Sequence, residues 1–320
     1  MLLGPTGAGK TLLLETIMGF NTPDEGRILI DNQEITDVAP EKRGIGYVPQ
    51  NSVLFPHMTV HQNIAFGLKM RGKPKHEQDK TVNELLDLVG IKNLANRLPA
   101  GLSGGEKQKV ALARVLALDS KIVLLDEPLA AMDSETARQL RKELKRIHKE
   151  HRKTVVHVTH SLIEAFGLAD KLAIINAGEI VQVGKAKELA SNPKNEFAAR
   201  ILGYENVFRV AVIERGKDFS ILQVNDIKLR VLGSVEHVKL VAVRPEDITV
   251  ESSPIRDANA NVLKASIVDC SDLGPLVMIE VDAGLPLRVV MAKSYFLEKG
   301  FESGNDVWVK FKTDAVKIIE

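Results

Sequence analysis

The sequence predicts an α/β domain with a mainly parallel sheet over residues 1–203, followed by an all-β domain over residues 204–320. Up to about Gly203, short β-branched runs alternate with segments whose apolar residues recur at helical spacing. After Gly203, short alternating strands and turns replace them. The first pattern is typical of a parallel sheet covered by helices, and the second is typical of a small barrel.

The elements expected in the first domain follow in order along the chain. Residues 28–30 form a short strand before an Asp-Asn turn, and the β-branched runs 122–125 and 155–158 are expected to be buried strands. A helix is expected over 81–89, where apolar residues share one face, and another begins at Ser134.

A glycine-rich segment near the start of the chain fits the phosphate-loop pattern G-x-x-x-x-G-K-[ST] at every fixed position. It consists of Gly4, Pro5, Thr6, Gly7, Ala8, Gly9, Lys10 and Thr11. Glycines let backbone N–H groups surround phosphate oxygens, Lys10 can reach the β- and γ-phosphates, and the Thr11 hydroxyl can hold Mg²⁺. The helix expected over 12–18 directs its positive end at the same anion. The sequence therefore predicts a nucleotide site, although only residues 1–3 remain for the strand that should precede the loop.

The composition disfavours several other classes of function. The formal net charge is +1 at pH 7 without any block of like charge, which weighs against nucleic acid as a partner. The single cysteine, Cys270, excludes an internal disulfide and suits a reducing cytoplasm. No run of roughly 18 apolar residues occurs, and the N-terminus lacks the features of a signal peptide, so neither a membrane span nor secretion is expected.

An internal repeat is predicted in the second domain, over about 206–250 and 261–318. Four segments match in the same order: 206–209 with 261–264, 221–224 with 278–281, 229–231 with 287–289, and 241–248 with 309–316. Generic strand alternation is the alternative explanation. Two similar β units predict a small barrel or a pair of barrels.

Further residues indicate which class of nucleotide-binding protein this is. The strand over 122–125 ends in Asp126, placed to hold Mg²⁺ through water, and Glu127, placed one residue further out, where a water-activating base is needed. A Ser-Gly-Gly turn at 103–105 opens a helix and offers a second anion site. Two phosphate-facing surfaces on one chain suggest that two chains share each nucleotide. The sequence has no Asn-Lys-x-Asp segment, which disfavours a GTPase.

Over essentially its whole length, the chain resembles the ATP-binding subunit of an ABC importer. The family's elements occur in order, namely the phosphate loop 4–11, a glutamine loop at Gln50, a signature over 102–106 with Ser103, Gly104 and Gly105, the acids Asp126 and Glu127, a D-loop over 129–133 with Asp133, and a switch histidine, His160. The resemblance implies a P-loop NTPase fold with a helical subdomain over about 52–115, and hydrolysis of ATP to ADP and phosphate.

The resemblance also implies roles for the residues around the phosphates. Glu127 would activate the attacking water, and His160 would hydrogen-bond the γ-phosphate and hold that water in line. Gln50 would touch Mg²⁺ or the water, and it would hold the metal together with Thr11 and Asp126. The other histidines are expected to be ordinary surface residues.

Partners follow from the same resemblance. Two chains would form a homodimer, in which Ser103 and Gly105 contact the γ-phosphate bound by the opposite subunit and Asp133 bridges the chains. The apolar stretch 54–60 beside Gln50 would meet a transmembrane permease, with local packing as the alternative. A peripheral subunit on the cytoplasmic face of the membrane, served by an extracytoplasmic solute-binding protein, is therefore expected.

Three departures from the family pattern stand out. Glu106 occupies the end of the signature where the family usually has Gln, and the D-loop reads Ala-Ala-Met-Asp where Ser-Ala-Leu-Asp is common. Both are expected to do little damage. The third is the start of the chain, because family members carry antiparallel strands and an adenine-stacking aromatic residue before the loop. The sequence offers no residue for that role, and we expect that the chain is truncated at its N-terminus.

The second domain resembles the TOBE domain of importer ATPases, and within that group it looks most like molybdate-binding Mop-type repeats. The resemblance rests on 261–264, 291–294 and 309–316, but the usual Ser-Ala-Arg-Asn start is here Asp-Ala-Asn-Ala-Asn at 257–261. Lys293 and Ser294 could bind an oxyanion, with a solvated strand end as the alternative.

Molybdate or tungstate is therefore the leading substrate. Importers of sulfate, sugars, polyamines or ferric iron are the alternatives, together with a non-enzymatic oxyanion sensor. An ABC-type DNA-repair or translation ATPase is disfavoured by the near-neutral charge, the single ATPase unit and the TOBE-like second domain.

Overall fold

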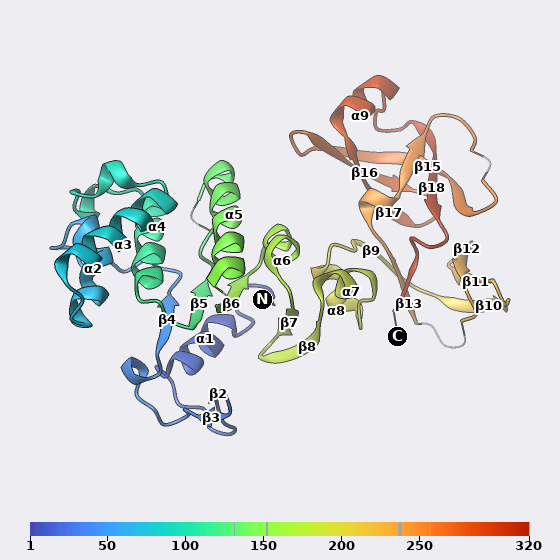
Figure 1. Ribbon diagram of the computed structural model, residues 1–320. Coiled ribbons are helices and arrows are strands. Elements are labelled where there is room, and N and C mark those ends of the chain that lie inside the picture. Colours follow the sequence, from blue (N-terminus) through green and yellow to red (C-terminus); the bar gives the residue numbers. More distant parts are fainter. Residues whose placement is uncertain (131, 152, 236–238, 256, 320) are drawn as a thin grey trace. The chain divides into compact units, whose positions relative to one another are not determined.

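The computed structural model describes residues 1–130, 132–151, 153–235, 239–255 and 257–319 (Figure 1). The chain divides into two compact units, unit 1 from Met1 to Ala186 and unit 2 from Lys187 to Glu320. This division lies before the change of sequence pattern at Gly203, because the short helices α7 (Ala186–Ser191) and α8 (Glu196–Ile201) fall largely in unit 2.

Unit 1 is built around a six-stranded sheet with the order β4-β5-β6-β1-β7-β8. The strands are β1 (Leu2–Leu3), β4 (Ile45–Val48), β5 (Ile122–Asp126), β6 (Thr154–Thr159), β7 (Leu172–Asn176) and β8 (Glu179–Gly184). Neighbouring strands pair in parallel, except that β7 and β8 form an antiparallel hairpin. The mainly parallel sheet expected from the sequence is confirmed, and the runs 122–125 and 155–158 lie in it as β5 and β6.

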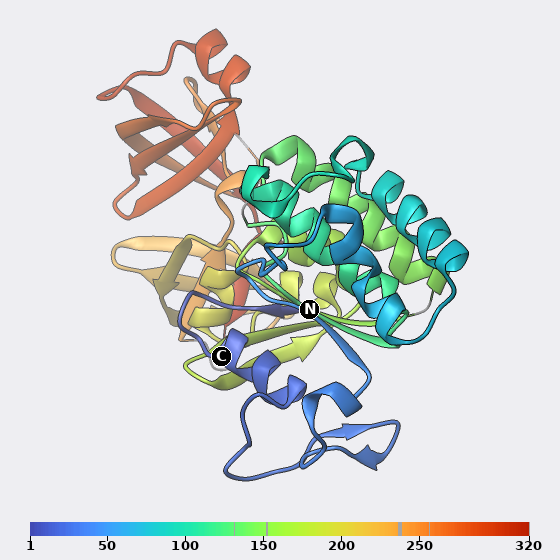
Figure 2. The same cartoon turned by 90° about the vertical axis from the view of Figure 1, so that its left-hand side faces the viewer.

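Helices cover both faces of this sheet (Figure 2). They are α1 (Lys10–Met18), α2 (Val60–Met70), α3 (Lys75–Leu88), α4 (Gly104–Ala117), α5 (Ser134–His151) and α6 (Leu162–Leu168). Side chains alternate along a strand, so β5 contributes to two cores. Leu124 packs in the cluster that contains α1, and Val123 and Leu125 pack in the cluster that contains α4 and α5. A small hairpin of β2 (Leu29–Ile30) and β3 (Gln33–Glu34) lies outside the sheet.

Helices α2, α3 and α4 pack on one another around a buried apolar cluster, which forms the helical subdomain. Helix α3 starts at Lys75, six residues before the start expected at Thr81. Residues 75–80 read Lys-His-Glu-Gln-Asp-Lys, so apolar periodicity could not reveal this polar part of the helix.

Unit 2 is mainly antiparallel β structure. Its sheets have the orders β10-β11-β12, β19-β13-β9 and β14-β18-β15-β16-β17, and helix α9 (Lys293–Lys299) follows β17. The strands are β9 (Asn206–Arg209), β10 (Ala211–Arg215), β11 (Phe219–Val224), β12 (Ile227–Leu232), β13 (Leu240–Val243), β14 (Thr249–Glu251), β15 (Ala260–Asp272), β16 (Leu276–Asp282), β17 (Pro286–Ala292), β18 (Asp306–Lys312) and β19 (Lys317–Ile319). One buried cluster runs through the three sheets.

The strand pairings in unit 2 support the repeat. Strand β9 pairs with β13 as the first part of β15 pairs with β18, and β10-β11-β12 form a meander like that of β15-β16-β17. One of the four sequence matches was wrong, however. Leu222 faces Leu229, and the residue that faces Leu287 is Val281, so Leu222 corresponds to Val281 rather than to Ile279. A shift of two residues keeps every side chain on its face, which is why the sequence pattern could not detect the error.

Two buried asparagines join the repeats. Asn206 in β9 donates from Nδ2 to the carbonyl oxygen of Arg288 (2.8 Å) and accepts its backbone N–H (2.7 Å). Asn261 in β15 makes the same pair of hydrogen bonds with the backbone of Arg230, at 2.9 and 2.6 Å. Arg230 in β12 and Arg288 in β17 occupy matching places in the two repeats. The asparagine of each repeat therefore hydrogen-bonds the backbone of an edge strand of the other repeat, β17 for Asn206 and β12 for Asn261.

Replacing Asn261 with Ala is expected to lower the free energy of unfolding of unit 2 by about 2 kcal/mol, because two hydrogen bonds to a buried side chain are lost. Trp308 in β18 is the chain's single tryptophan, so its fluorescence during urea unfolding reports on this unit. The exposed Asn259 provides a matched control, whose replacement is expected to change stability by less than about 0.5 kcal/mol. Equal stability of both variants would contradict the prediction.

Candidate active site

The predicted phosphate loop connects β1 to α1, and its last two residues begin the helix. The loop comprises Gly4, Pro5, Thr6, Gly7, Ala8, Gly9, Lys10 and Thr11. Gly7 and Gly9 have φ values of +82° and +91°, a conformation that residues with a side chain rarely adopt. A Cβ atom on Gly4 would lie 2.5 Å from the carbonyl oxygen of Ile175 in β7. The glycines are therefore required by the backbone path.

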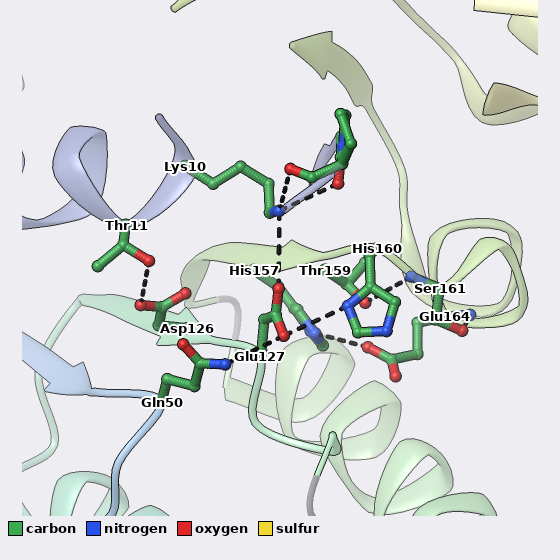
Figure 3. Close-up of polar contacts among 12 residues, drawn as sticks. Lys10, Thr11, Gln50, Asp126, Glu127, His157, Thr159, His160, Ser161 and Glu164 are labelled. Carbon is green, nitrogen blue, oxygen red and sulfur yellow. Dashed lines mark hydrogen bonds and ion pairs between the residues drawn. The ribbon is translucent and has the colours of Figure 1, made fainter. Parts of the chain in front are cut away.

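Backbone carbonyl groups of this loop hold the ammonium group of Lys10 (Figure 3). Its side chain is 5% exposed, and Nζ donates to the carbonyl oxygens of Gly4 (3.0 Å) and Pro5 (2.9 Å). The same atom lies 3.6 Å from Oε1 of Glu127. Phosphate oxygens could replace these oxygen acceptors without any change in the chemistry of the contact.

Two of the three residues expected to hold Mg²⁺, Thr11 and Asp126, lie together. Thr11 Oγ1 donates to Oδ2 of Asp126 at 2.8 Å. Asp126 is buried at the end of β5, and its other oxygen, Oδ1, has no hydrogen-bond partner among the described residues. Burial raises the pKa of this carboxyl above its ordinary value, although the Thr11 hydrogen bond opposes the shift. A buried carboxylate oxygen without a partner fits Mg²⁺ or a water bound to it.

Among the side chains predicted to be catalytic, those of Gln50 and His160 both contact the Glu127 carboxylate. Gln50 Nε2 donates to its Oε2 at 3.4 Å, and Nδ1 of His160 lies 3.3 Å from the same atom. Its backbone has a φ of 45°, the left-handed conformation that is uncommon for a residue other than glycine. Such strained residues cluster at functional sites.

The topology of the sheet explains this convergence. Gln50, Glu127 and His160 follow β4, β5 and β6, which are neighbours in the parallel part of the sheet, and Lys10 follows β1 beside β6. The carboxyl ends of parallel strands open at one edge, where ligands bind in sheets of this kind. Whether Gln50 also joins the metal stays a prediction.

The signature residues cap helix α4. Ser103 Oγ accepts the backbone N–H of Glu106 (3.3 Å), and the Glu106 carboxylate accepts that of Ser103 (2.7 Å). This reciprocal cap uses the carboxylate at the position where the family usually has Gln, and the hydrogen bond from the Ser103 backbone lowers the pKa of Glu106. Ser103 and Gly104 are exposed, and Gly105 is half-buried. Among the described residues, no hydrogen bond or ion pair joins these three to the phosphate loop.

Asp133 caps the following helix. Its Oδ1 accepts the backbone N–H of Thr136 at 2.9 Å, which lowers the pKa of the exposed carboxyl. Ala131 of the same D-loop lies outside the described residues. The bridging role of Asp133 stays a prediction.

The apolar stretch 54–60 is held by one buried side chain. Asn63 bonds the backbone of Phe55 in both directions and donates to the carbonyl oxygen of Met58. Leu54 packs against two of the buried clusters of unit 1, so local packing accounts for this one residue of the stretch. Val53, just before the stretch, is 68% exposed.

In unit 2, Lys293 begins α9 and its Nζ donates to Oδ2 of Asp272 at 2.5 Å. Both side chains are substantially exposed. Because the ammonium group of Lys293 already pairs with a carboxylate, the contact favours the alternative of a solvated strand end over an oxyanion site at Lys293.

One histidine outside the predicted set departs from the expectation that such residues lie on the surface. His157 in β6 is 2% exposed, and its Nε2 lies 3.0 Å from Oε2 of Glu164 in α6. The expectation was wrong because the run 155–158 forms a buried strand, in which a polar residue requires a partner. That polar residue was the signal available in the sequence, although nothing there pointed to Glu164.

Comparisons with known proteins match both units. Residues 1–130 match the family model of the ABC transporter, and residues 241–319 match that of the TOBE domain. The chain is 43% identical over 319 residues to a molybdate/tungstate import ATP-binding protein from Pyrococcus abyssi, covering 99% of this chain and 91% of the relative. It is 38% identical to a sulfate/thiosulfate import ATP-binding protein from Thermosynechococcus vestitus, covering 97% and 87%.

Among solved structures, the chain resembles a dimeric ATP-binding cassette in a post-hydrolysis state bound to ADP and Pi. The TM-score is 0.55 at 33% identity, over 58% of this chain and 84% of that one. A second match is cbiO1 from Clostridium perfringens, part of an ABC transporter complex, with a TM-score of 0.53 at 32% identity over 59% of this chain and 77% of that one. No helix among the described residues is long and apolar enough to cross a membrane.

Proposed function

Because the chain belongs to the family of ABC transporter ATP-binding proteins, we propose that it drives the import of molybdate or tungstate by hydrolysing ATP. The ABC-type ATPase domain is shown by the family match and by the relatives, whose names describe import ATP-binding proteins. The substrate and the roles of individual residues are the proposal.

One observation carries the choice of substrate. The relatives named for molybdate and tungstate are 43% identical over 99% of this chain, whereas those named for sulfate or for spermidine and putrescine reach 38% at comparable coverage. The matches to the molybdate/tungstate relatives cover 99% of the chain and so include unit 2, the part in which the sequence resembles oxyanion-binding repeats.

The geometry supports a division of labour at the nucleotide. Lys10 would exchange the carbonyl oxygens of Gly4 and Pro5 for phosphate oxygens. Thr11 and Asp126 would hold Mg²⁺, which neutralises charge on the phosphates when bound. Glu127 would accept the proton of the attacking water, since its carboxylate lies where Gln50 and His160 can orient that water.

A second copy of the chain would complete the site. Ser103, Gly104 and Asp133 are exposed, and no polar contact joins the signature to the phosphate loop of its own chain among the described residues. A homodimer would bring the signature of one subunit to the γ-phosphate on the other. The stretch 54–60 would face a permease, so the dimer would lie at the cytoplasmic side of the membrane with a solute-binding protein on the other side.

Reconstituted transport tests the substrate. Vesicles that contain this chain, its cognate permease and the binding protein are expected to accumulate molybdate or tungstate with ATP inside, at least about ten times faster than sulfate or spermidine at equal concentration. Uptake should disappear with Glu127→Gln, which controls for leakage. Faster uptake of sulfate or spermidine would overturn the oxyanion assignment while leaving the ATPase intact.

A further inference from the structure

Two histidines three residues apart along the chain each face a glutamate (Figure 3). His160, which directly follows β6, lies 3.3 Å from Glu127, and its side chain is 56% exposed. His157, inside β6, lies 3.0 Å from Glu164, and this pair is buried. The exposed histidine belongs to the site already described, whereas the buried one has no part in it.

The His157–Glu164 pair joins the two ends of the loop that carries His160. His157 belongs to β6, which ends at Thr159, and Glu164 belongs to α6, which begins at Leu162. Within the loop, the backbone N–H of Ser161 donates to Thr159 Oγ1 (3.0 Å), and that of Glu164 donates to Ser161 Oγ (3.4 Å). Strand, loop and helix are therefore linked by side-chain hydrogen bonds at each step.

Helix α6 cannot hold this arrangement by itself. It has seven residues, and isolated helices of that length are unstable in water. The exposed ring of His160 makes few contacts that could fix its direction. The position of its backbone, and hence of Nδ1 relative to Glu127, depends on how firmly α6 is attached to β6.

We infer that His157 and Glu164 are positioning residues, which fix the loop so that His160 points at Glu127 and the γ-phosphate. The inference rests on the role proposed above for His160. The electrostatics agree with a firm link: burial alone would raise the pKa of Glu164, but hydrogen bonds from His157 and Thr159, together with the nearby Arg141, outweigh it and lower the pKa. Buried polar pairs can often be replaced by apolar residues of similar size without unfolding the protein.

That last point supplies the test. The double variant His157→Phe/Glu164→Leu replaces the pair with apolar residues of similar size, so the strand and helix keep their packing. We expect kcat for ATP hydrolysis to fall about 10-fold, because displacement of a catalytic group by less than an ångström has effects of this order. The dissociation constant for ATP should change by less than about 2-fold, since neither replaced residue belongs to the phosphate loop.

A conservative variant and a matched control separate positioning from stability. Glu164→Gln keeps an acceptor for His157, and it should retain at least about half of the wild-type kcat. His148→Gln removes another histidine that faces an acid, Asp170 at 2.8 Å, and it should leave kcat unchanged. Melting temperatures of all variants show whether each is folded. If the double variant lost stability but kept its kcat, the pair would be structural only.

The same replacements in a His160→Ala background distinguish failure of this inference from failure of the proposed function. If the pair acts through His160, it should have no further effect on kcat once that ring is gone. An equal 10-fold loss in both backgrounds would overturn the inference. If His160→Ala alone left kcat unchanged, the role proposed for His160 would be wrong, and with it the basis for positioning.

Discussion

Replacing Glu127 with Gln is expected to lower kcat for ATP hydrolysis about 10³-fold, within the range found for loss of a general base. The amide has the size and shape of the carboxylate but cannot accept the proton of the attacking water. Glu127 directly follows β5, and its carboxylate contacts the side chains of Gln50, His160 and Lys10. We therefore expect it to be the general base.

The same change should not weaken ATP binding. Nζ of Lys10 is held 3.6 Å from the Glu127 carboxylate, and this attraction competes with phosphate for the ammonium group. Removing the charge of Glu127 removes the competition, so ATP is expected to bind equally well or a few times more tightly. Loss of turnover with retained affinity is the signature of a group that acts in the transition state.

Phosphate release at saturating MgATP measures kcat, and equilibrium binding of ATP measures affinity. Glu196→Gln is a suitable control, because Glu196 is a half-buried glutamate of unit 2 whose side chain pairs with Arg200, which does not belong to the nucleotide site. It should match the wild type in both assays. Normal hydrolysis by Glu127→Gln would mean that another group takes the proton.

Local patterns predicted most of the site because its geometry follows from local rules. Gly7 and Gly9 must adopt positive φ, so the phosphate loop is visible as glycines at fixed spacing. Gln50, Glu127 and His160 each follow a strand, and neighbouring parallel strands end at one edge of a sheet. The glycine rule and the strand-end rule were sufficient for the phosphate loop and for Asp126 and Glu127, whereas Gln50 and His160 were predicted from the resemblance to a family, and only the order of the strands shows why they lie beside Glu127.

Two kinds of feature could not be predicted from the sequence. The first is a contact between side chains that no spacing rule describes, and the second is a repeating pattern that fits more than one alignment. Glu164 is seven residues from His157, and no spacing rule links a strand residue to a helix residue across a loop. The bonds of Asn206 and Asn261 to the opposite repeat need the three-dimensional arrangement of both repeats. The match of Leu222 to Ile279 failed because alternation has a period of two and tolerates such a shift.

Replacing Lys10 with Ala is expected to weaken ATP binding at least about 100-fold, because charge-assisted hydrogen bonds to phosphate contribute about 1.5–3 kcal/mol each. The ammonium group is buried at the centre of the phosphate loop, where three oxygen atoms lie around it. The side chain is only 5% exposed to solvent. Isothermal titration with ATP and Mg²⁺ measures the change. Lys153→Gln is the matched control, since Lys153 is a buried lysine that pairs with Asp119 instead, and it should bind ATP like the wild type.

The double variant Lys10→Ala/Glu127→Gln tests the electrostatic part of this argument. Without Lys10, the Glu127 carboxylate faces the phosphates without the ammonium group between them, and its repulsion adds to the loss of the hydrogen bonds. Removing that charge should therefore restore part of the affinity lost in Lys10→Ala, by about 3- to 10-fold. Identical affinities of the single and double variants would show that Lys10 acts through its hydrogen bonds alone. Unchanged binding in Lys10→Ala would instead show that ATP does not lie against this loop.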